Sequence, residues 1–122
     1  MAHMARSVLV VDDDDDFRKL AARTVRSWGC TVVGEAGSVA EAIAASATVR
    51  PEAILVDVGL PDGDGFALAE RLAALPWRPV VVVISSDADA ANGFSADRSG
   101  ARGFFPKEEL TSAPLRELIG GA

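Results

Sequence analysis

Short runs of β-branched and apolar residues recur about every two dozen positions along this 122-residue chain, and stretches with helical spacing separate them. The runs begin near residues 7, 31, 53, 79 and 102. Because strand and helix alternate five times, we predict right-handed crossover connections and a parallel sheet that helices cover on both faces. The sequence therefore predicts one α/β domain of the doubly wound (βα)5 type, with no linker and no second domain.

The first predicted helix runs from Phe17 to Trp28, where apolar residues recur at helical spacing and Gly29 can end the helix. Asp16 is the expected N-cap, and Asp14 and Asp15 are interpreted as acids that favour a helix N-terminus. The residues expected to face the core are Phe17, Leu20, Ala21, Thr24, Val25 and Trp28.

The later helices are marked by caps and apolar stripes. Ser38 and Glu41 form a capping-box pattern, which predicts a second helix that ends at Ala47. Residues 87–100 contain one large apolar residue, Phe94, so we expect any helix there to be short and weakly packed. Two more helices are predicted over Phe66–Leu75 and Thr111–Ile119.

The composition excludes several classes of protein. The net charge of −6 argues against a domain that grips nucleic-acid phosphates by itself. Cys30 is the single cysteine, which excludes an internal disulfide and a four-cysteine zinc site and favours a reducing cytoplasm. No apolar run approaches the roughly 20 residues of a membrane helix. Residues 1–4, Met-Ala-His-Met, are interpreted as an expression-vector remnant, which leaves residues 5–122 for the domain.

Polar residues follow four of the predicted strands at the point where each strand ends. They are Asp12 and Asp13 after the first strand, Asp57 after the third, Ser85 and Ser86 after the fourth, and Lys107 beyond the fifth. Open parallel sheets bind ligands beyond these carboxyl ends, so the side chains should converge. Clustered carboxylates repel one another, and a hard dication such as Mg²⁺ relieves that repulsion. A carboxylate beside Mg²⁺ can attack phosphorus, while a hydroxyl and a lysine stabilise the moving charge.

Four segments carry a family resemblance, and each follows its own strand: VVDD at 10–13, LVDVGLPDGDG at 55–65, ISS at 84–86 and GARGFFPK at 100–107. Together they closely resemble the receiver domains of two-component signalling systems, over nearly the whole chain. The resemblance implies a flavodoxin-like fold whose five-stranded sheet has the order 2-1-3-4-5, the known order of the chemotaxis receiver. One departure is that Pro106 precedes Lys107, whereas the family's proline usually follows the lysine.

The resemblance also implies a metal site and a phosphoacceptor. Asp57 is the residue that takes the phosphoryl group. Asp13 and Asp57 bind Mg²⁺ directly together with the carbonyl of Gly59, Asp12 acts mostly through a metal-bound water, and Mn²⁺ can substitute.

Three further residues have roles that the resemblance implies. Ser85 is the switch hydroxyl that reaches for the phosphate, with Ser86 as the open alternative, and Lys107 pairs with the phosphate. Phe104 occupies the aromatic switch position, although plain core packing is an equally good interpretation of that residue. Phosphorylation is expected to remodel the face formed by the fourth helix, fifth strand and fifth helix.

The expected partners follow from the same resemblance. A sensor histidine kinase, a phosphotransfer protein or a small donor such as acetyl phosphate supplies the phosphoryl group, and an unknown downstream protein is controlled. The domain catalyses only its own phosphorylation and dephosphorylation, binds no membrane or nucleic acid directly, and is a monomer or a phosphorylation-dependent homodimer. Residues 120–122 end the chain without an effector domain, so we expect a stand-alone receiver rather than a fragment of a DNA-binding regulator.

Three other functions compete with this one. A haloacid-dehalogenase-like phosphatase would use Asp12 as its nucleophile, but the class needs another acidic pair on a later strand. A flavodoxin-like electron carrier would bind flavin phosphate after the first strand, where five aspartates would repel it. A receiver-like module that no longer takes phosphate would keep the same fold. Asp62 and Asp64 are interpreted as turn residues.

Overall fold

The fold is an open parallel sheet of five strands, in a computed structural model that describes residues 6–86 and 100–121. The strands are β1 (Ser7–Val11), β2 (Thr31–Ala36), β3 (Ala53–Asp57), β4 (Val80–Ser85) and β5 (Gly103–Pro106). Their order is β2-β1-β3-β4-β5, and every neighbouring pair is parallel. The predicted fold class and strand order are therefore confirmed.

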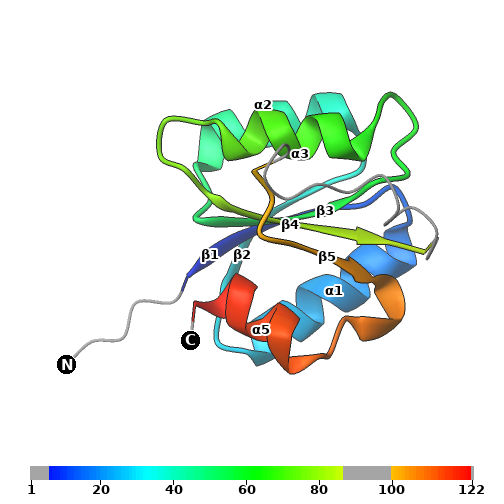
Figure 1. The fold of residues 1–122 in the computed structure, drawn as a ribbon, viewed down its shortest axis with the longest axis vertical. Coiled ribbons are helices and arrows are strands. Elements are labelled where there is room, and N and C mark those ends of the chain that lie inside the picture. The colour runs from blue at the N-terminus through cyan, green and yellow to red at the C-terminus, as the bar shows by residue number, and fades with distance from the viewer. Residues whose placement is uncertain (1–5, 87–99, 122) are drawn as a thin grey trace.

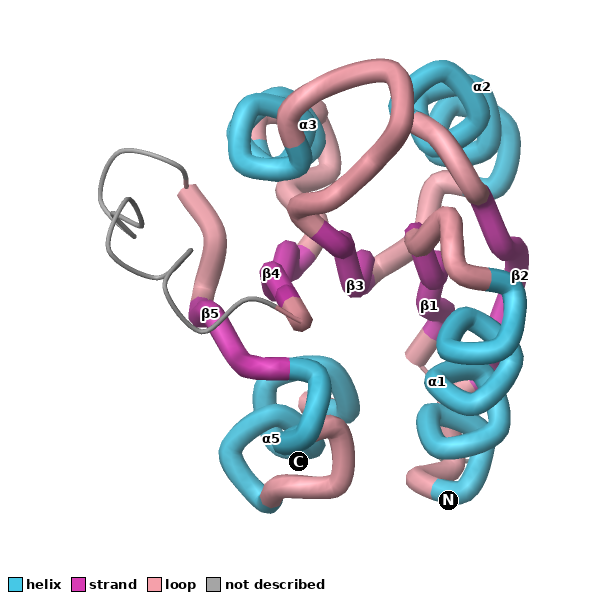
Figure 2. Tube along the Cα trace, turned by 90° about the vertical axis from the view of Figure 1, so that its right-hand side faces the viewer, coloured by secondary structure: helices cyan, strands magenta, loops and turns pink. Residues whose placement is uncertain are grey.

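Helices cover both faces of the sheet, as the alternating pattern predicts. They are α1 (Asp15–Ser27), α2 (Val39–Val49), α3 (Gly65–Ala73), α5 (Ala113–Gly120) and the short 3₁₀ helix η2 (Lys107–Glu109). Figure 2 shows α2 and α3 on one face and α1 and α5 on the other. The predicted weak helix around Phe94 lies outside the described residues. Within the described ranges, no helix is long and apolar enough to span a membrane.

Alternate residues of the central strands enter two separate cores. Leu9, Ile54 and Val81 pack under α2 and α3, whereas Val8, Leu55 and Val82 pack against α1 and α5. All six side chains are fully buried. A strand that is buried on both faces needs a continuous apolar run, which is the pattern that these strands carry. This rigid sheet fixes the positions of the polar residues at its carboxyl edge.

Two predictions about the first helix are wrong. Asp14, not Asp16, is the N-cap, because its extended backbone lies just outside the helix and its carboxylate accepts hydrogen bonds from the amides of Asp16 and Phe17. Leu20 does not face the core, since 44% of it is exposed while Ala22 is buried in the helix instead. The other element ends differ from the predictions by less than one helical turn.

Candidate functional site

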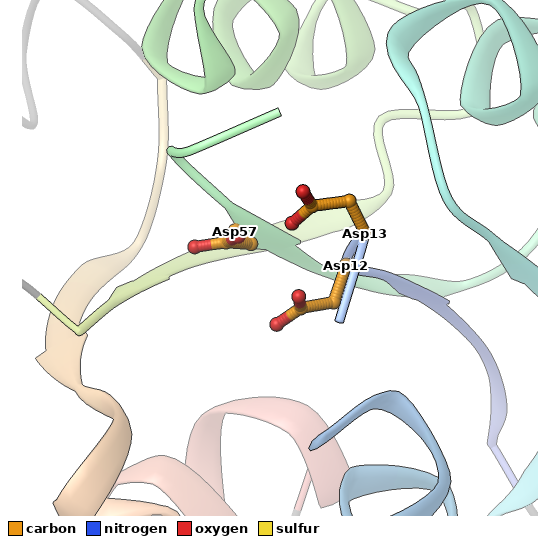
Figure 3. A group of neighbouring side chains, drawn as sticks. All are labelled: Asp12, Asp13 and Asp57. Atoms are coloured by element: carbon orange, nitrogen blue, oxygen red, sulfur yellow. The ribbon is translucent and has the colours of Figure 1, made fainter. Parts of the chain in front are cut away.

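Three carboxylates meet at the carboxyl edge of the sheet. Asp12 and Asp13 follow β1 and Asp57 ends β3, and one oxygen of each lies within 4.8 Å of the others. Figure 3 shows the three side chains directed toward a common space. The site lies between β1 and β3, where the strand order reverses and open sheets bind ligands. Asp12 is fully buried and Asp57 is 5% exposed, whereas Asp13 is exposed.

A single ammonium group contacts this cluster within the described part of the chain. Lys107, the first residue of η2, places Nζ 2.8 Å from Asp12 Oδ2 and 3.8 Å from Asp57 Oδ2. The same Nζ lies 4.4 Å from the centroid of the Phe17 ring, which is close enough for a cation–π contact. Lys107 is therefore held from two sides, by the carboxylates of the sheet edge and by the first turns of α1.

The electrostatic balance of the cluster remains negative. Burial raises the pKa of Asp57, and the nearby charge of Asp12 raises it further, although Lys107 and a hydrogen bond from the Gly59 backbone oppose the shift. One lysine cannot neutralise three carboxylates. The ligand atoms are hard oxygens at close range, which is the donor set that Mg²⁺ selects. The residues present therefore fit a divalent metal ion.

A cleft of about 470 Å³ opens over the cluster. Its lining residues are Asp13, Asp14, Asp57, Val58, Gly59, Ser85, Ser86 and Lys107. Ser85 ends β4 and is 2% exposed, while Ser86 is exposed just beyond the strand. Both serines line the cleft although their exposure differs, so the lining of the cleft does not decide between them.

Glycines shape the loop that follows Asp57. A Cβ on Gly65 would lie 2.3 Å from Val58 Cα and 2.4 Å from the carbonyl oxygen of Asp57, so α3 can begin this close to β3 only with glycine. A Cβ on Gly59 would make an ordinary contact, 3.7 Å from Asp57 Oδ2. Gly65 is therefore a steric requirement, whereas a Cβ at position 59 would fit without a clash.

Phe104 lies beside the site but not in it. Its half-buried ring on β5 stacks on Phe66 of α3, with centroids 6.1 Å apart and planes 15° from parallel. Phe104 therefore packs at the edge of the core that α2 and α3 cover.

Two residues around the site, Arg18 and Asp62, make contacts that the sequence does not predict. Arg18 donates from Nη1 to the carbonyl oxygen of Asp12 at 2.8 Å and from Nε to Glu35 at 3.1 Å, so it ties α1 to the ends of β1 and β2. Asp62 accepts hydrogen bonds from the amides of Val39 and Ala40, at the start of α2. Helical periodicity placed Arg18 on the side away from the core, and no local pattern links Asp62 to residues more than twenty positions away.

A family model described as the response regulator receiver domain matches residues 8–119, so the chain belongs to this family of two-component signalling domains. Receiver domains are in general signalling phosphoacceptors, and an aspartate is the group that is phosphorylated.

Curated relatives contain this domain as a part. The chain is 41% identical over 103 residues to the DNA-binding transcriptional activator DevR/DosR of Mycobacterium tuberculosis, covering 83% of this chain and 47% of that protein. It is 33% identical over 109 residues to protein-glutamate methylesterase/protein-glutamine glutaminase 3 of Hahella chejuensis, covering 88% of this chain and 31% of that protein. The chain thus spans about a third to a half of the length of the curated relatives it matches.

Solved structures agree with the fold. The signal receiver domain of the response regulator NarL from Mycobacterium tuberculosis superposes with a TM-score of 0.81 at 29% identity, covering 97% of this chain and 99% of that chain. The chemotaxis response regulator CheY4 of Vibrio cholerae superposes with a TM-score of 0.78 at 22% identity, covering 95% and 100%. The second likeness concerns the fold alone.

Proposed function

We propose that this receiver domain takes a phosphoryl group on Asp57 from a histidine kinase, a phosphotransfer protein or a small phosphodonor, with Mg²⁺ as cofactor. The observation that carries the proposal is the clustering of the Asp12, Asp13 and Asp57 carboxylates within 4.8 Å of one another, beside a cleft that Asp13 and Asp57 line, with Lys107 as the matching cation. Asp13, Asp57 and the Gly59 carbonyl are assigned to the metal ion, and Asp12 to a water bound to it. Mn²⁺ is expected to substitute.

The chemistry is an in-line displacement at phosphorus. An oxygen of the Asp57 carboxylate forms a bond to phosphorus while the bond from phosphorus to the donor nitrogen or oxygen breaks, and the leaving group keeps the electron pair. When bound there, Mg²⁺ would supply positive charge to the phosphoryl oxygens. Lys107 and the hydroxyl of Ser85 stabilise the charge on those oxygens, and the exposed side of the cleft admits the donor.

The proposed output is a change of conformation rather than catalysis on another molecule. Ser85 moves toward the phosphoryl group, and Phe104 turns from its contact with Phe66 to fill the space. β5, α5 and the expected fourth helix, which lies outside the described residues, then present a different face to a downstream protein. The domain is then a switch that catalyses only its own phosphorylation and dephosphorylation.

Intact-protein mass spectrometry after incubation with acetyl phosphate tests the proposal. A single phosphoryl adduct is expected with Mg²⁺, no adduct with a chelator, and no adduct for Asp57→Asn. Loss of the adduct in Asp12→Asn but not in Asp57→Asn would contradict the proposal and favour the phosphatase class. Failure of the parent chain to bind beryllofluoride with Mg²⁺ would instead indicate a module that works without phosphate.

A further inference from the structure

The loop after Asp57 is fastened to the rest of the molecule at its base and at its tip. We call residues 58–64 the β3–α3 loop. At its base, the Val58 amide donates to Ile84 O at 3.1 Å, and the Gly65 amide donates to Val58 O at 3.2 Å. These bonds close the loop. Between its two ends lie Gly59, which lines the cleft, and Asp62, which does not.

The tip of the loop is fastened to α2 by one side chain. Asp62 Oδ1 accepts from the Val39 amide at 2.7 Å, and Oδ2 accepts from the Ala40 amide at 3.1 Å. These two hydrogen bonds lower the pKa of Asp62, so the carboxylate stays ionised over a wide pH range. A Cβ on Gly63 would lie 3.1 Å from Val39 Cγ2, which shows how closely the loop approaches the first residue of α2.

The N-terminus of α2 has two caps from different parts of the chain. Ser38 accepts from the Glu41 amide through Oγ and from the Ala42 amide through its carbonyl oxygen. The amides of Val39 and Ala40 are left over, and Asp62 accepts from both. The amides of the first three helical residues, which have no intrahelical partner, are thus all satisfied, and two of the three by a residue of the β3–α3 loop.

We propose that Asp62 is a positioning residue, which fastens the tip of the β3–α3 loop to α2 and thereby holds the Gly59 backbone at the metal site. The inference rests on the proposed function, since Gly59 is assigned there to Mg²⁺. A loop that is closed at its base can still tilt about that base. The bond from the Gly59 backbone to the Asp57 carboxylate lies on the same segment, so a tilt would move both the amide and the carbonyl of Gly59.

Asp62→Ala and Asp64→Ala form a matched pair of variants for the test. Each removes one carboxylate from the same loop and from the start of a helix, since Asp64 caps its own helix through the Phe66 amide at 2.9 Å. Two quantities are measured in each: hydrogen exchange of the Val39 and Ala40 amides, and the Kd of Mg²⁺ from a MgCl₂ titration followed by backbone amide resonances. The first reports on the attachment to α2 and the second on the metal site.

For Asp62→Ala we expect faster exchange at both amides and a Mg²⁺ Kd about three- to tenfold higher, which is the size of a lost helix cap. For Asp64→Ala we expect a change in Kd of less than about twofold and unchanged exchange at Val39 and Ala40. Asp62→Asn, which keeps one acceptor oxygen, should fall between parent and Asp62→Ala.

Two outcomes overturn the inference while leaving the proposed function intact. One is faster amide exchange in Asp62→Ala without weaker Mg²⁺ binding, because the attachment of the loop to α2 then does not position the Gly59 backbone. The other is equal weakening by Asp62→Ala and Asp64→Ala, because loss of loop charge then explains the effect. Absence of Mg²⁺ binding by the parent chain is a different result: it contradicts the proposed function itself, and the positioning role with it.

Discussion

Polar groups have opposite surroundings at the amino edge of the sheet, where the strands begin, and at the carboxyl edge, where they end. At the amino edge, Ser7 and Glu52 exchange hydrogen bonds in both directions, with the Ser7 amide 2.9 Å from Glu52 Oε1 and the Glu52 amide 3.0 Å from Ser7 Oγ. The Trp77 indole donates to Pro51 O at 2.9 Å, and Arg50 lies 4.5 Å above its ring. At the carboxyl edge, three carboxylates, two of them buried, lie together, and within the described chain one ammonium group contacts them.

The polar groups at the amino edge stabilise the fold, whereas those at the carboxyl edge are arranged to bind a ligand. The amino edge gains a net contribution of about 1 kcal/mol from each well-made hydrogen bond. The carboxyl edge holds Asp57 beside Asp12 in a buried place, an arrangement that costs stability until positive charge arrives. Polar residues thus stabilise the chain at one edge and prepare it for binding at the other.

The first prediction, with the largest expected effect, concerns the rigidity of the backbone at the carboxyl edge, where the carboxylates repel one another. Gly65→Ala should lower the free energy of unfolding by about 3 kcal/mol, because its Cβ collides with backbone rather than with a flexible side chain. Urea unfolding measures the change. Gly120→Ala is the control: a Cβ there meets nothing within 4 Å, and alanine should stabilise the end of α5 slightly. Equal free energies of unfolding for the two variants would show that the backbone after Asp57 can shift to accommodate a Cβ.

The second prediction concerns the ion pair of the carboxyl edge. Lys107→Met should lower the free energy of unfolding by about 2 kcal/mol at neutral pH, since it leaves the fully buried Asp12 without its cation. Adding Asp12→Asn to Lys107→Met should recover most of the loss. A double-mutant cycle by urea unfolding gives the coupling energy. Strictly additive effects would mean that Asp12 and Lys107 do not depend on each other.

The third prediction concerns the amino edge. Trp77→Phe should lower the free energy of unfolding by about 1 kcal/mol, because the indole loses its hydrogen bond to Pro51 O. Mg²⁺ affinity should stay unchanged, since the residue lies at the opposite edge. Trp28→Phe is the control, as its indole has no hydrogen-bond partner among the described residues. A change in Mg²⁺ affinity for Trp77→Phe would contradict the view that the two edges act independently.

The smallest expected effect is a gain in stability. The pKa of Asp57 is raised in the folded chain, so the folded state binds a proton on this carboxyl group more tightly than the unfolded state does. The free energy of unfolding therefore falls as the pH rises from the ordinary pKa of an aspartate through the raised pKa. Asp57→Asn removes that loss and should be more stable than the parent at neutral pH, with the difference fading as pH falls toward the ordinary carboxyl range. Saturating Mg²⁺ should stabilise the parent more than the variant. Urea midpoints at several pH values, with and without MgCl₂, measure both effects.

Much of this architecture follows from patterns within single elements. Apolar runs predict the strands, and parallel strands bring the residues that follow them to one edge, which is how Asp12, Asp57 and Lys107 are found together. The strand order did not come from those patterns; it needed the family resemblance. The sequence therefore predicts the members of the cluster, but not the distances that decide its charge balance.

Contacts between distant elements could not be predicted. Five consecutive aspartates are all competent caps, and the choice of Asp14 depends on a turn in which Asp12 Oδ1 accepts from the Asp14 amide at 2.8 Å. Helical spacing gives the direction of a side chain but not what lies there, so Leu20 was assigned to the core and Arg18 away from it. Such details depend on the packing of neighbours that the local sequence does not contain.

The edge strand β5 limits how copies of this chain can assemble. It is four residues long and ends in Pro106, which has no backbone N–H to donate. Short edges that contain proline are poor templates for adding a strand from another molecule. Growth of the sheet across β5 into a second copy, and with it ordered aggregation along this side, is therefore disfavoured. Pairing of two copies on this side would have to use helical surfaces, whose side chains can be rearranged without breaking the sheet.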